Sequence, residues 1–229
     1  MNSTKYLYPL EQSFRSHANP GKAKWMSAYL LHKFAFLGIT FPDRRHLQKE
    51  FFDVYGYPER DNVNLIAEKA WQYPEREFQH FAVDLLIKYR QDYREEDIFL
   101  FEKLITDKSW WDTVDALAGW IIGPYFLLFP ENIKVFTGKW VDSDNIWLQR
   151  AALLFQLKYK KDMDFELLSK YILKLKHSKE FFIRKAIGWI LREYSKFFPE
   201  AVISFVKSHK LPPLSTREAL RIVKKKGII

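Results

Sequence analysis

Cysteine is absent from the 229 residues of this chain, and its absence excludes several kinds of chemistry. Without cysteine there is no disulfide, no thiolate metal ligand and no cysteine nucleophile, a composition that suits a cytoplasmic protein. The six histidines lack HExxH or similar ligand spacing, so we expect no metal site. Glycine is scarce, with no phosphate-binding glycine loop, dinucleotide fingerprint or GxSxG elbow. An enzyme built from this chain is therefore expected to use no cofactor.

Long apolar runs are also missing. The most apolar segment, 121–129, contains Gly123 and Pro124 and is too short to span a bilayer. The chain starts without a basic segment followed by an apolar stretch, so no signal peptide is expected. Apolar residues still make up 48% of the sequence, enough for a substantial core. We expect one repeat domain over residues 1–229.

Acidic residues are few in the second part of the chain. Residues 151–229 contain 18 Lys and Arg against 7 Asp and Glu, a balance of +11, whereas residues 1–150 contain 19 against 21, a balance of −2. These balances sum to the net charge of +9. A basic region with interleaved aromatic residues suits a polyanion such as nucleic acid. The alternative is a solvated basic surface with a charged tail at 224–226.

Apolar residues recur at spacings of three and four along most of the chain, which predicts many short helices. Four similar stretches can be aligned on Phe78, Trp111, Trp147 and Phe182, at intervals of 33, 36 and 35 residues. Such intervals are typical of two-helix solenoid repeats. We therefore expect an all-α solenoid.

The position four residues after each of these aromatic residues is small in three repeats and acidic in one. The four residues are Ala82, Asp115, Ala151 and Ala186. Close helix packing favours a small residue there, so the carboxylate of Asp115 needs another explanation. Trp111 lies one turn earlier on the same helix face. An aromatic plane beside a carboxylate can hold a cationic ring and stabilise positive charge. The alternative is an ion pair between Asp115 and a neighbouring Arg or Lys.

The residues around this pair have structural explanations. Ser109 is the expected N-cap of the helix and Asp112 the N3 residue of a capping box, whereas Asp115 lies beyond the box and caps nothing. Trp110 is expected to pack. Gly119, one turn after Asp115, is expected to leave open space beside the carboxylate.

A second tryptophan, Trp189, is expected on the polar face of its helix, with Lys185 four residues before it and Arg192 three after. An aromatic side chain between two cations suits contact with a nucleic acid backbone. The alternative is burial of Trp189 against the neighbouring repeat. Together with Arg150 and Lys158 of the preceding repeat, these cations are expected to form a positive concave track.

Three segments resemble the AlkD type of bacterial DNA alkylation repair glycosylase, and the likeness extends from about Leu10 to Ile228. They are Lys108–Asp115, Ser143–Arg150 and Ser178–Tyr194. The resemblance implies a right-handed superhelix of HEAT-like repeats whose basic concave face binds duplex DNA. It also implies excision of cationic alkylated purines such as 3-methyladenine and 7-methylguanine, the first step of base excision repair.

The resemblance implies roles for the cleft residues. The family's catalytic aspartate falls on Asp115, and the tryptophan one turn earlier on Trp111. The second cleft tryptophan falls on Trp189, and the arginine facing the lesion strand on Arg150. The carboxylate would stabilise the oxocarbenium-like sugar and position water. The two tryptophans would flank the sugar and exclude solvent.

Further residues are expected to contact DNA. The amino-terminal helix that supports lesion recognition would be Asn19–Phe36, with its aromatic residue at Tyr29. Backbone-binding positions fall on Lys158 and Arg192, and the charge pattern adds Lys185. The expected partner is duplex DNA with alkylated bases, without membrane or metal. The protein is expected to be a bacterial cytoplasmic monomer, associated with the nucleoid when on DNA.

Two other classes stay open. A non-catalytic HEAT-repeat protein that binds damaged or branched DNA would be expected to lack the acid or the cleft tryptophans, and this chain keeps both. A helical scaffold for an acidic protein partner would explain the charge. It would not explain Trp189 on a polar face or Asp115 at an alanine position.

Overall fold

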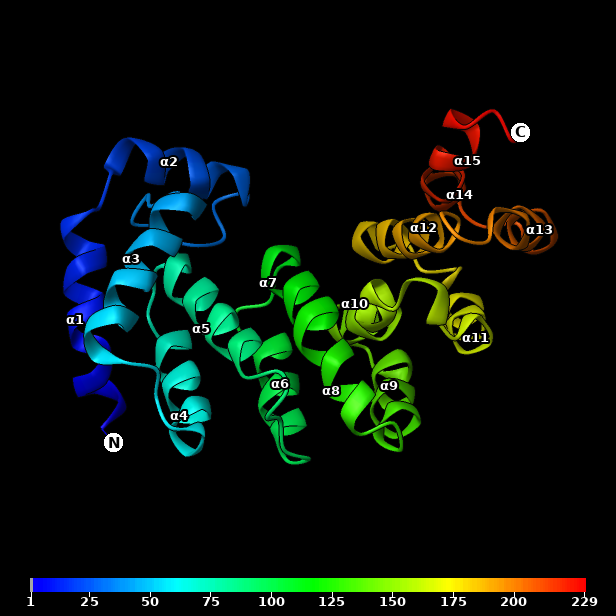
Figure 1. The fold of residues 1–229 in the computed structure, drawn as a ribbon. Helices are drawn as coiled ribbons and strands as arrows, with labels where there is room; N and C mark the ends of the chain where they lie inside the picture. Colours follow the sequence, from blue (N-terminus) through cyan, green and yellow to red (C-terminus); the bar gives the residue numbers. More distant parts are fainter. Residues whose placement is uncertain (1) are drawn as a thin grey trace. The chain divides into compact units, whose positions relative to one another are not determined.

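The computed structural model describes residues 2–229, and these residues contain helices and connections but no strand. Their one β-type contact is an isolated bridge between Ala35 and Glu75. The chain forms two compact units (Figure 1), unit 1 ending at Leu100 and unit 2 running from Phe101 to Ile229. The prediction of an all-α fold is confirmed, whereas a single domain over 1–229 stays a prediction.

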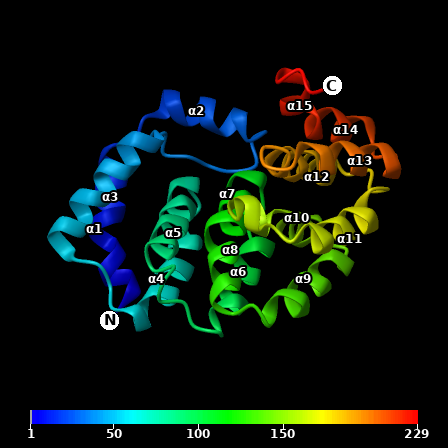
Figure 2. The same cartoon turned by 45° about the vertical axis from the view of Figure 1, so that its right-hand side comes forward.

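The described residues of unit 1 form five complete helices. They are α1 (Ser3–Ser16), α2 (Pro20–Tyr29), α3 (Phe41–Tyr55), α4 (Arg60–Trp71) and α5 (Arg76–Lys88), and the boundary between units falls inside α6 (Asp97–Thr106). Helix α1 packs against α3 and α4, and α4 packs against α5. Buried aromatic rings such as Phe14 and Phe78, whose centroids are 5.3 Å apart, fill the space between these helices. Helix α2 lies at one end of α3 and α5 (Figures 1 and 2) and buries none of its residues.

Unit 2 continues as a series of short helices. They are α7 (Trp111–Ala116), the π-helical η1 (Leu117–Ile122), α8 (Gly123–Leu128), α9 (Asn132–Asp142), α10 (Ile146–Leu154), the 3₁₀ helices η2 (Phe155–Lys158) and η3 (Lys160–Asp162), α11 (Phe165–Leu175), α12 (Phe181–Tyr194), α13 (Pro199–His209), α14 (Pro213–Ala219) and α15 (Arg221–Lys225). Along this unit α7 contacts α10, α10 contacts α12, and α12 contacts α14. The second helices of successive pairs therefore stack side by side, as expected for a helical repeat.

The aligned aromatic residues mark equivalent places in the fold. Trp111, Trp147 and Phe182 each lie at or next to the start of a helix, namely α7, α10 and α12, and Phe78 lies near the start of α5. Four residues later, the three alanines are completely buried. The repeat read from the sequence is confirmed, and Asp115 is the position that departs from it.

No helix in residues 2–229 is long and apolar enough to cross a membrane.

Candidate active site in unit 2

The carboxylate of Asp115 is bound by both arms of one guanidinium group. Arg150 Nε donates to Asp115 Oδ1 at 2.6 Å, and Nη2 donates to Oδ2 at 2.8 Å. The side chains are only 15% and 5% exposed respectively, so the pair is largely desolvated. Bidentate pairing of this kind fixes the orientation of a carboxylate as well as its charge. The ion pair considered as an alternative from the sequence therefore exists, and its partner is Arg150.

Arg150 also connects the next repeat to this pair. Its Nη1 donates to the backbone carbonyl of Phe182 at 2.5 Å, and its guanidinium carbon lies 5.9 Å from the centre of the Phe182 ring. Asp115, Arg150 and Phe182 belong to α7, α10 and α12, so one arginine connects three stacked helices. Arg150 is therefore buried within unit 2 and does not line an open basic surface.

An aromatic cluster lies beside this arginine. The centroid of Trp110 is 5.5 Å from that of Trp147 and 5.1 Å from that of Phe182, and the last two are 5.0 Å apart. Each ring comes from the start of one of the three helices, so the cluster fixes how α7, α10 and α12 pack. The expectation that Trp110 packs is confirmed. Trp110, the residue before the aligned Trp111, contacts the anchors of the next two repeats.

The start of α7 differs from the expected capping box. The helix begins at Trp111, its N-cap is Trp110, and no side chain makes the cap hydrogen bond. The Ser109 hydroxyl instead donates to the carbonyl of Ile105 at 2.6 Å, at the end of α6. The capping-box prediction is wrong because Ser109 satisfies the end of the preceding helix. Asp112 lies in the first turn of α7.

Immediately after the helical turn that carries Asp115, the backbone changes to a π-helix over Leu117–Ile122. Pro124 follows at the start of α8, and it has no N–H to continue the i→i−4 ladder. π-Helical turns are rare and occur frequently at functional sites. Gly119 packs here against Leu157, whose Cδ2 would lie 3.6 Å from a Cβ at position 119. A Cβ would fit there at ordinary contact distance, so the open space expected beside Asp115 stays a prediction.

The charge state of Asp115 reflects two opposing effects. Burial raises the pKa of the Asp115 carboxyl above its ordinary value, whereas the hydrogen bonds and charge of Arg150 lower it. The nearby Asp112 carboxylate adds a smaller upward contribution to the same pKa. Each oxygen of an ionised carboxylate can accept more than one hydrogen bond, so Asp115 keeps acceptor capacity beyond Arg150.

Trp111 and Trp189 lie on helices that flank α10. Trp111 is the first residue of α7, one turn before Asp115, and Trp189 lies in α12; both side chains are half-buried. The expected apolar stripe of α12, which includes Ile183, Ile187 and Ile190, is buried, so Trp189 lies off the core face.

The cations on either side of Trp189 share one acidic partner. Lys185 Nζ lies 3.0 Å from Glu218 Oε1 in α14, and Arg192 Nη1 donates to the other carboxylate oxygen. Hydrogen bonds from Lys185, together with the charges of both cations, hold the pKa of Glu218 below its ordinary value. Lys185 and Arg192 are thus brought together and oriented, with part of their charge neutralised within unit 2.

Lys158 belongs to unit 2 and Tyr29 to unit 1. Lys158 is exposed at the end of η2, with its Nζ 4.2 Å from the centre of the Trp120 ring. It lines a 220 Å³ cavity together with Lys160 and Lys196. Tyr29 is the last residue of α2 in unit 1.

The described residues contain no cluster of His, Cys, Asp and Glu that could hold a metal ion.

A sequence model of a family described as DNA alkylation repair enzyme matches residues 10–223, which is most of the chain. The chain belongs to the DNA alkylation repair enzyme family. A solved structure described as a predicted DNA alkylation repair enzyme from Enterococcus faecalis is 35% identical, with a TM-score of 0.82. The match covers 89% of this chain and 95% of that one.

Two more distant structures from Streptococcus mutans share the fold. AlkD2 has a TM-score of 0.60 at 20% identity and covers 89% of this chain and 98% of its own. The protein smu.31 has a TM-score of 0.58 at 20% identity and covers 77% and 95%. Curated proteins give no match. The resemblance to the AlkD type is confirmed, and the chain has a role in the repair of alkylation damage to DNA.

Sequence reasoning missed several residues of this candidate site. Phe182 supplies a carbonyl to Arg150, and Glu218 binds two cations from another helix. The repeat register did mark Phe182, but only as a packing anchor. No local signal could have connected Glu218 with Arg192, because the two are 26 residues apart and on different helices.

Proposed function

We propose that this chain is a DNA glycosylase that hydrolyses the N-glycosidic bond of cationic alkylated purines, such as 3-methyladenine and 7-methylguanine, in duplex DNA. The observation that carries this proposal is the Asp115 carboxylate, desolvated and oriented by Arg150 at a position where the other repeats have alanine. A fixed anionic group in a low-dielectric site is well suited to stabilise positive charge that develops in a transition state.

The chemistry needs only modest help from the protein. When the C1′–N bond breaks, its electron pair goes to the purine, which leaves as a neutral base because alkylation had made it cationic. The deoxyribose gains oxocarbenium character, which Asp115 stabilises. Water attacks C1′, and its proton passes to the carboxylate or to solvent. Trp111 and Trp189 would flank the sugar, while Lys158, Arg192 and Lys185 would bind phosphates. Tyr29 would support lesion recognition.

Arg150 has a different role in this proposal from the one that the resemblance implied. Its three nitrogens all donate within unit 2, and its side chain is buried. We assign it as a positioning residue that fixes the orientation and ionisation of Asp115. Lesion-strand contact would use its two remaining N–H groups.

A second candidate function has one observation in its favour. Both oxygens of Asp115 are engaged by Arg150, as expected if the ion pair only connects repeats. The chain would then be a non-catalytic HEAT-repeat protein that binds damaged or branched DNA. The two candidates differ in whether removal of the Asp115 charge abolishes chemistry or only lowers stability.

The deciding experiment compares two matched substitutions. Asp84 in unit 1 forms a similar pair with Arg44: Nη1 to Oδ2 is 2.5 Å, and the side chains are 17% and 5% exposed. We expect Asp115→Asn to lower the release of 7-methylguanine from methylated duplex by at least about 100-fold. Asp84→Asn should lose stability, of the order of 3 kcal/mol or less, and keep the wild-type rate when both variants are assayed folded.

Base release by Asp115→Asn at the wild-type rate would assign the pair to structure alone. No release by the wild type of either 7-methylguanine or 3-methyladenine would favour the non-catalytic candidate. Circular dichroism at the assay temperature shows that each variant is folded.

A further inference from the structure

Helix α2 presents two exposed aromatic rings that the fold leaves outside its core. Trp25 is 68% exposed and Tyr29 is 62% exposed. Their ring planes are 14° apart with centroids at 5.9 Å, which is an offset stack. No residue of α2 is buried. We call Trp25 and Tyr29 the aromatic platform.

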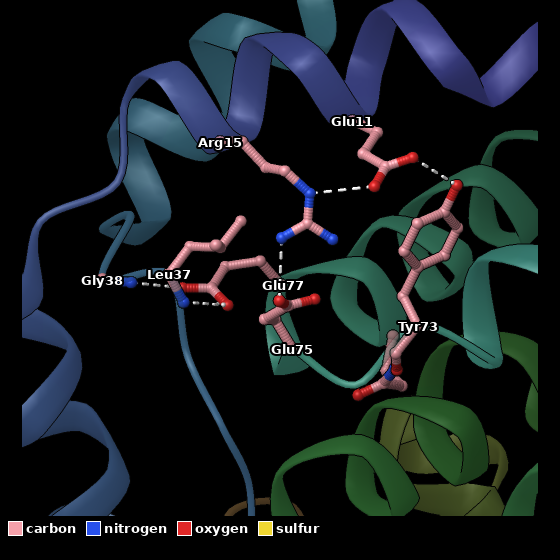
Figure 3. Close-up of polar contacts among 8 residues, drawn as sticks. Glu11, Arg15, Leu37, Gly38, Tyr73, Glu75 and Glu77 are labelled. Carbon is pink, nitrogen blue, oxygen red and sulfur yellow. Dashed lines mark hydrogen bonds and ion pairs between the residues drawn. The ribbon is translucent and has the colours of Figure 1, made fainter.

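The platform is nevertheless held firmly, through the loop that follows α2. The buried carboxylate of Glu77, at the start of α5, accepts from the backbone N–H groups of Leu37 and Gly38 at 3.0 and 2.9 Å (Figure 3). It also accepts from the N–H of Ile39 at 3.1 Å. Three backbone donors on one carboxylate leave this segment little freedom.

The loop in turn fixes the start and the end of α2. Asn19, the N-cap of α2, donates its N–H to the carbonyl of Leu37 at 2.8 Å. Near the other end, the Ser27 hydroxyl donates to the carbonyl of Phe34 at 2.9 Å, and the Phe34 ring lies 3.8 Å from the buried Arg76 guanidinium. Both ends of the helix are therefore tied to α5. The rings are held in place before any ligand arrives, so less entropy is lost on binding.

The charge of α2 and the area of the aromatic platform indicate which kind of ligand the platform binds. Helix α2 carries Lys22 and Lys24 and no acidic residue, which favours an anion. The exposed side chain of Lys22 lies 3.7 Å from Asp43, also exposed. Two aromatic side chains bury roughly 300–500 Å² at most, well below the roughly 1,000 Å² that a stable protein interface needs. A patch of this size fits one nucleobase better than a second copy of the chain.

We infer that the aromatic platform, with Trp25 as its more exposed ring, stacks on an unpaired base of DNA. In a paired duplex both faces of each base are covered by its neighbours, whereas an unpaired or extruded base offers a free π-face to an aromatic side chain. Trp25 thereby gives the protein a preference for duplexes whose pairing is locally broken. This assignment rests on the proposed function for the choice of DNA as partner, and it goes beyond it by adding a stacking site in unit 1.

The test uses undamaged DNA, so that it does not depend on catalysis. Two fluorescent duplexes closed by hairpins at both ends are compared, one fully paired and one with a single unpaired adenine. Closed ends remove terminal base pairs as stacking sites. We expect the wild type to prefer the unpaired base. Trp25→Ala should reduce that preference by about tenfold, since stacking contributes roughly 1–3 kcal/mol per base. Trp25→Phe should retain most of it.

The matched control is Tyr8→Ala, which removes an aromatic ring of unit 1 that is 59% exposed and lies on α1. This variant should keep the wild-type preference. Equal preference in the wild type and Trp25→Ala would overturn the inference. So would a wild-type dimer that Trp25→Ala converts to monomer in sedimentation velocity, because the platform would then be a protein interface.

Base release from methylated duplex, measured in parallel, separates the two proposals. A wild type that releases no base but shows a Trp25-dependent preference refutes the glycosylase and supports the platform. If base release depends on Asp115 and the preference does not depend on Trp25, the glycosylase is supported and the platform is refuted.

Discussion

A single arginine side chain, Arg150, connects α7, α10 and α12 around the Asp115 carboxylate. Taking both charges out of water is costly, and the guanidinium offsets that cost only because its two donors match the two carboxylate oxygens. The pair therefore stabilises an ionised acid at a place where burial alone would favour the neutral form. Under the proposed function, in which Asp115 stabilises positive charge, this balance sets the pH range of activity.

The opposing effects of burial and of Arg150 on the pKa of Asp115 can be tested by removing the guanidinium group. Arg150→Met leaves Asp115 buried without its counter-charge, so the pKa of Asp115 should rise further above its ordinary value. Base release fails as pH falls through that pKa, because the protonated acid carries no charge. The acid limb of the single-turnover pH–rate profile should therefore move to higher pH. Arg44→Met, which breaks the comparable pair with Asp84, should leave the limb in place. An unmoved limb in Arg150→Met would contradict the role of Arg150.

At the scale of elements, the sequence predicted the regularly spaced helix starts better than the local departures from regular helix. The intervals between Phe78, Trp111, Trp147 and Phe182 located four helix starts, because stacked repeats need the same packing residues at the same places. The predicted capping box is absent because a serine hydroxyl can bind a carbonyl at the end of one helix as readily as an N–H group at the start of the next. Ser109 donates to the carbonyl of Ile105 at the end of α6. The π-helix after Asp115 depends on a small shift in backbone bonding that no residue pattern specifies.

The loop between α2 and α3 contains another such exception, at Gly38. Its φ of +87° favours glycine, and a Cβ there would lie 2.1 Å from the Asn19 carbonyl oxygen. We expect Gly38→Ala to lower the free energy of unfolding by more than about 2 kcal/mol, through strain plus the clash. Gly56→Ala is the matched control, since Gly56 has φ +71° but open space around it. Its ψ of 166° is also a conformation that other residues rarely adopt, so Gly56→Ala should cost roughly 1–3 kcal/mol through strain alone, less than Gly38→Ala, which adds the clash. Urea denaturation measures both, and equal losses would show that the close approach to α2 is unimportant.

At the scale of the whole molecule, the basic charge lies in the carboxyl-terminal part of the chain. Residues 151–229 carry a balance of +11, yet Lys185 and Arg192 are partly neutralised by Glu218. The sequence revealed the excess charge because composition is visible without a fold. It could not show which cations are paired, since ion pairs between helices depend on tertiary packing. A count of lysines and arginines therefore overestimates the charge available to a phosphate backbone.

The number of phosphate contacts can be measured directly by salt dependence. If Lys158 and Arg192 each bind a phosphate, substitution of either by Ala should lower the slope of log affinity against log salt by about 0.9 for undamaged duplex. Lys174→Ala is the control, because Lys174 is a half-exposed cation of α11 that lies 2.5 Å from Asp142. It removes the same charge and should leave the slope unchanged. A slope that falls equally in all three variants would mean that net charge, and not a defined track, attracts DNA.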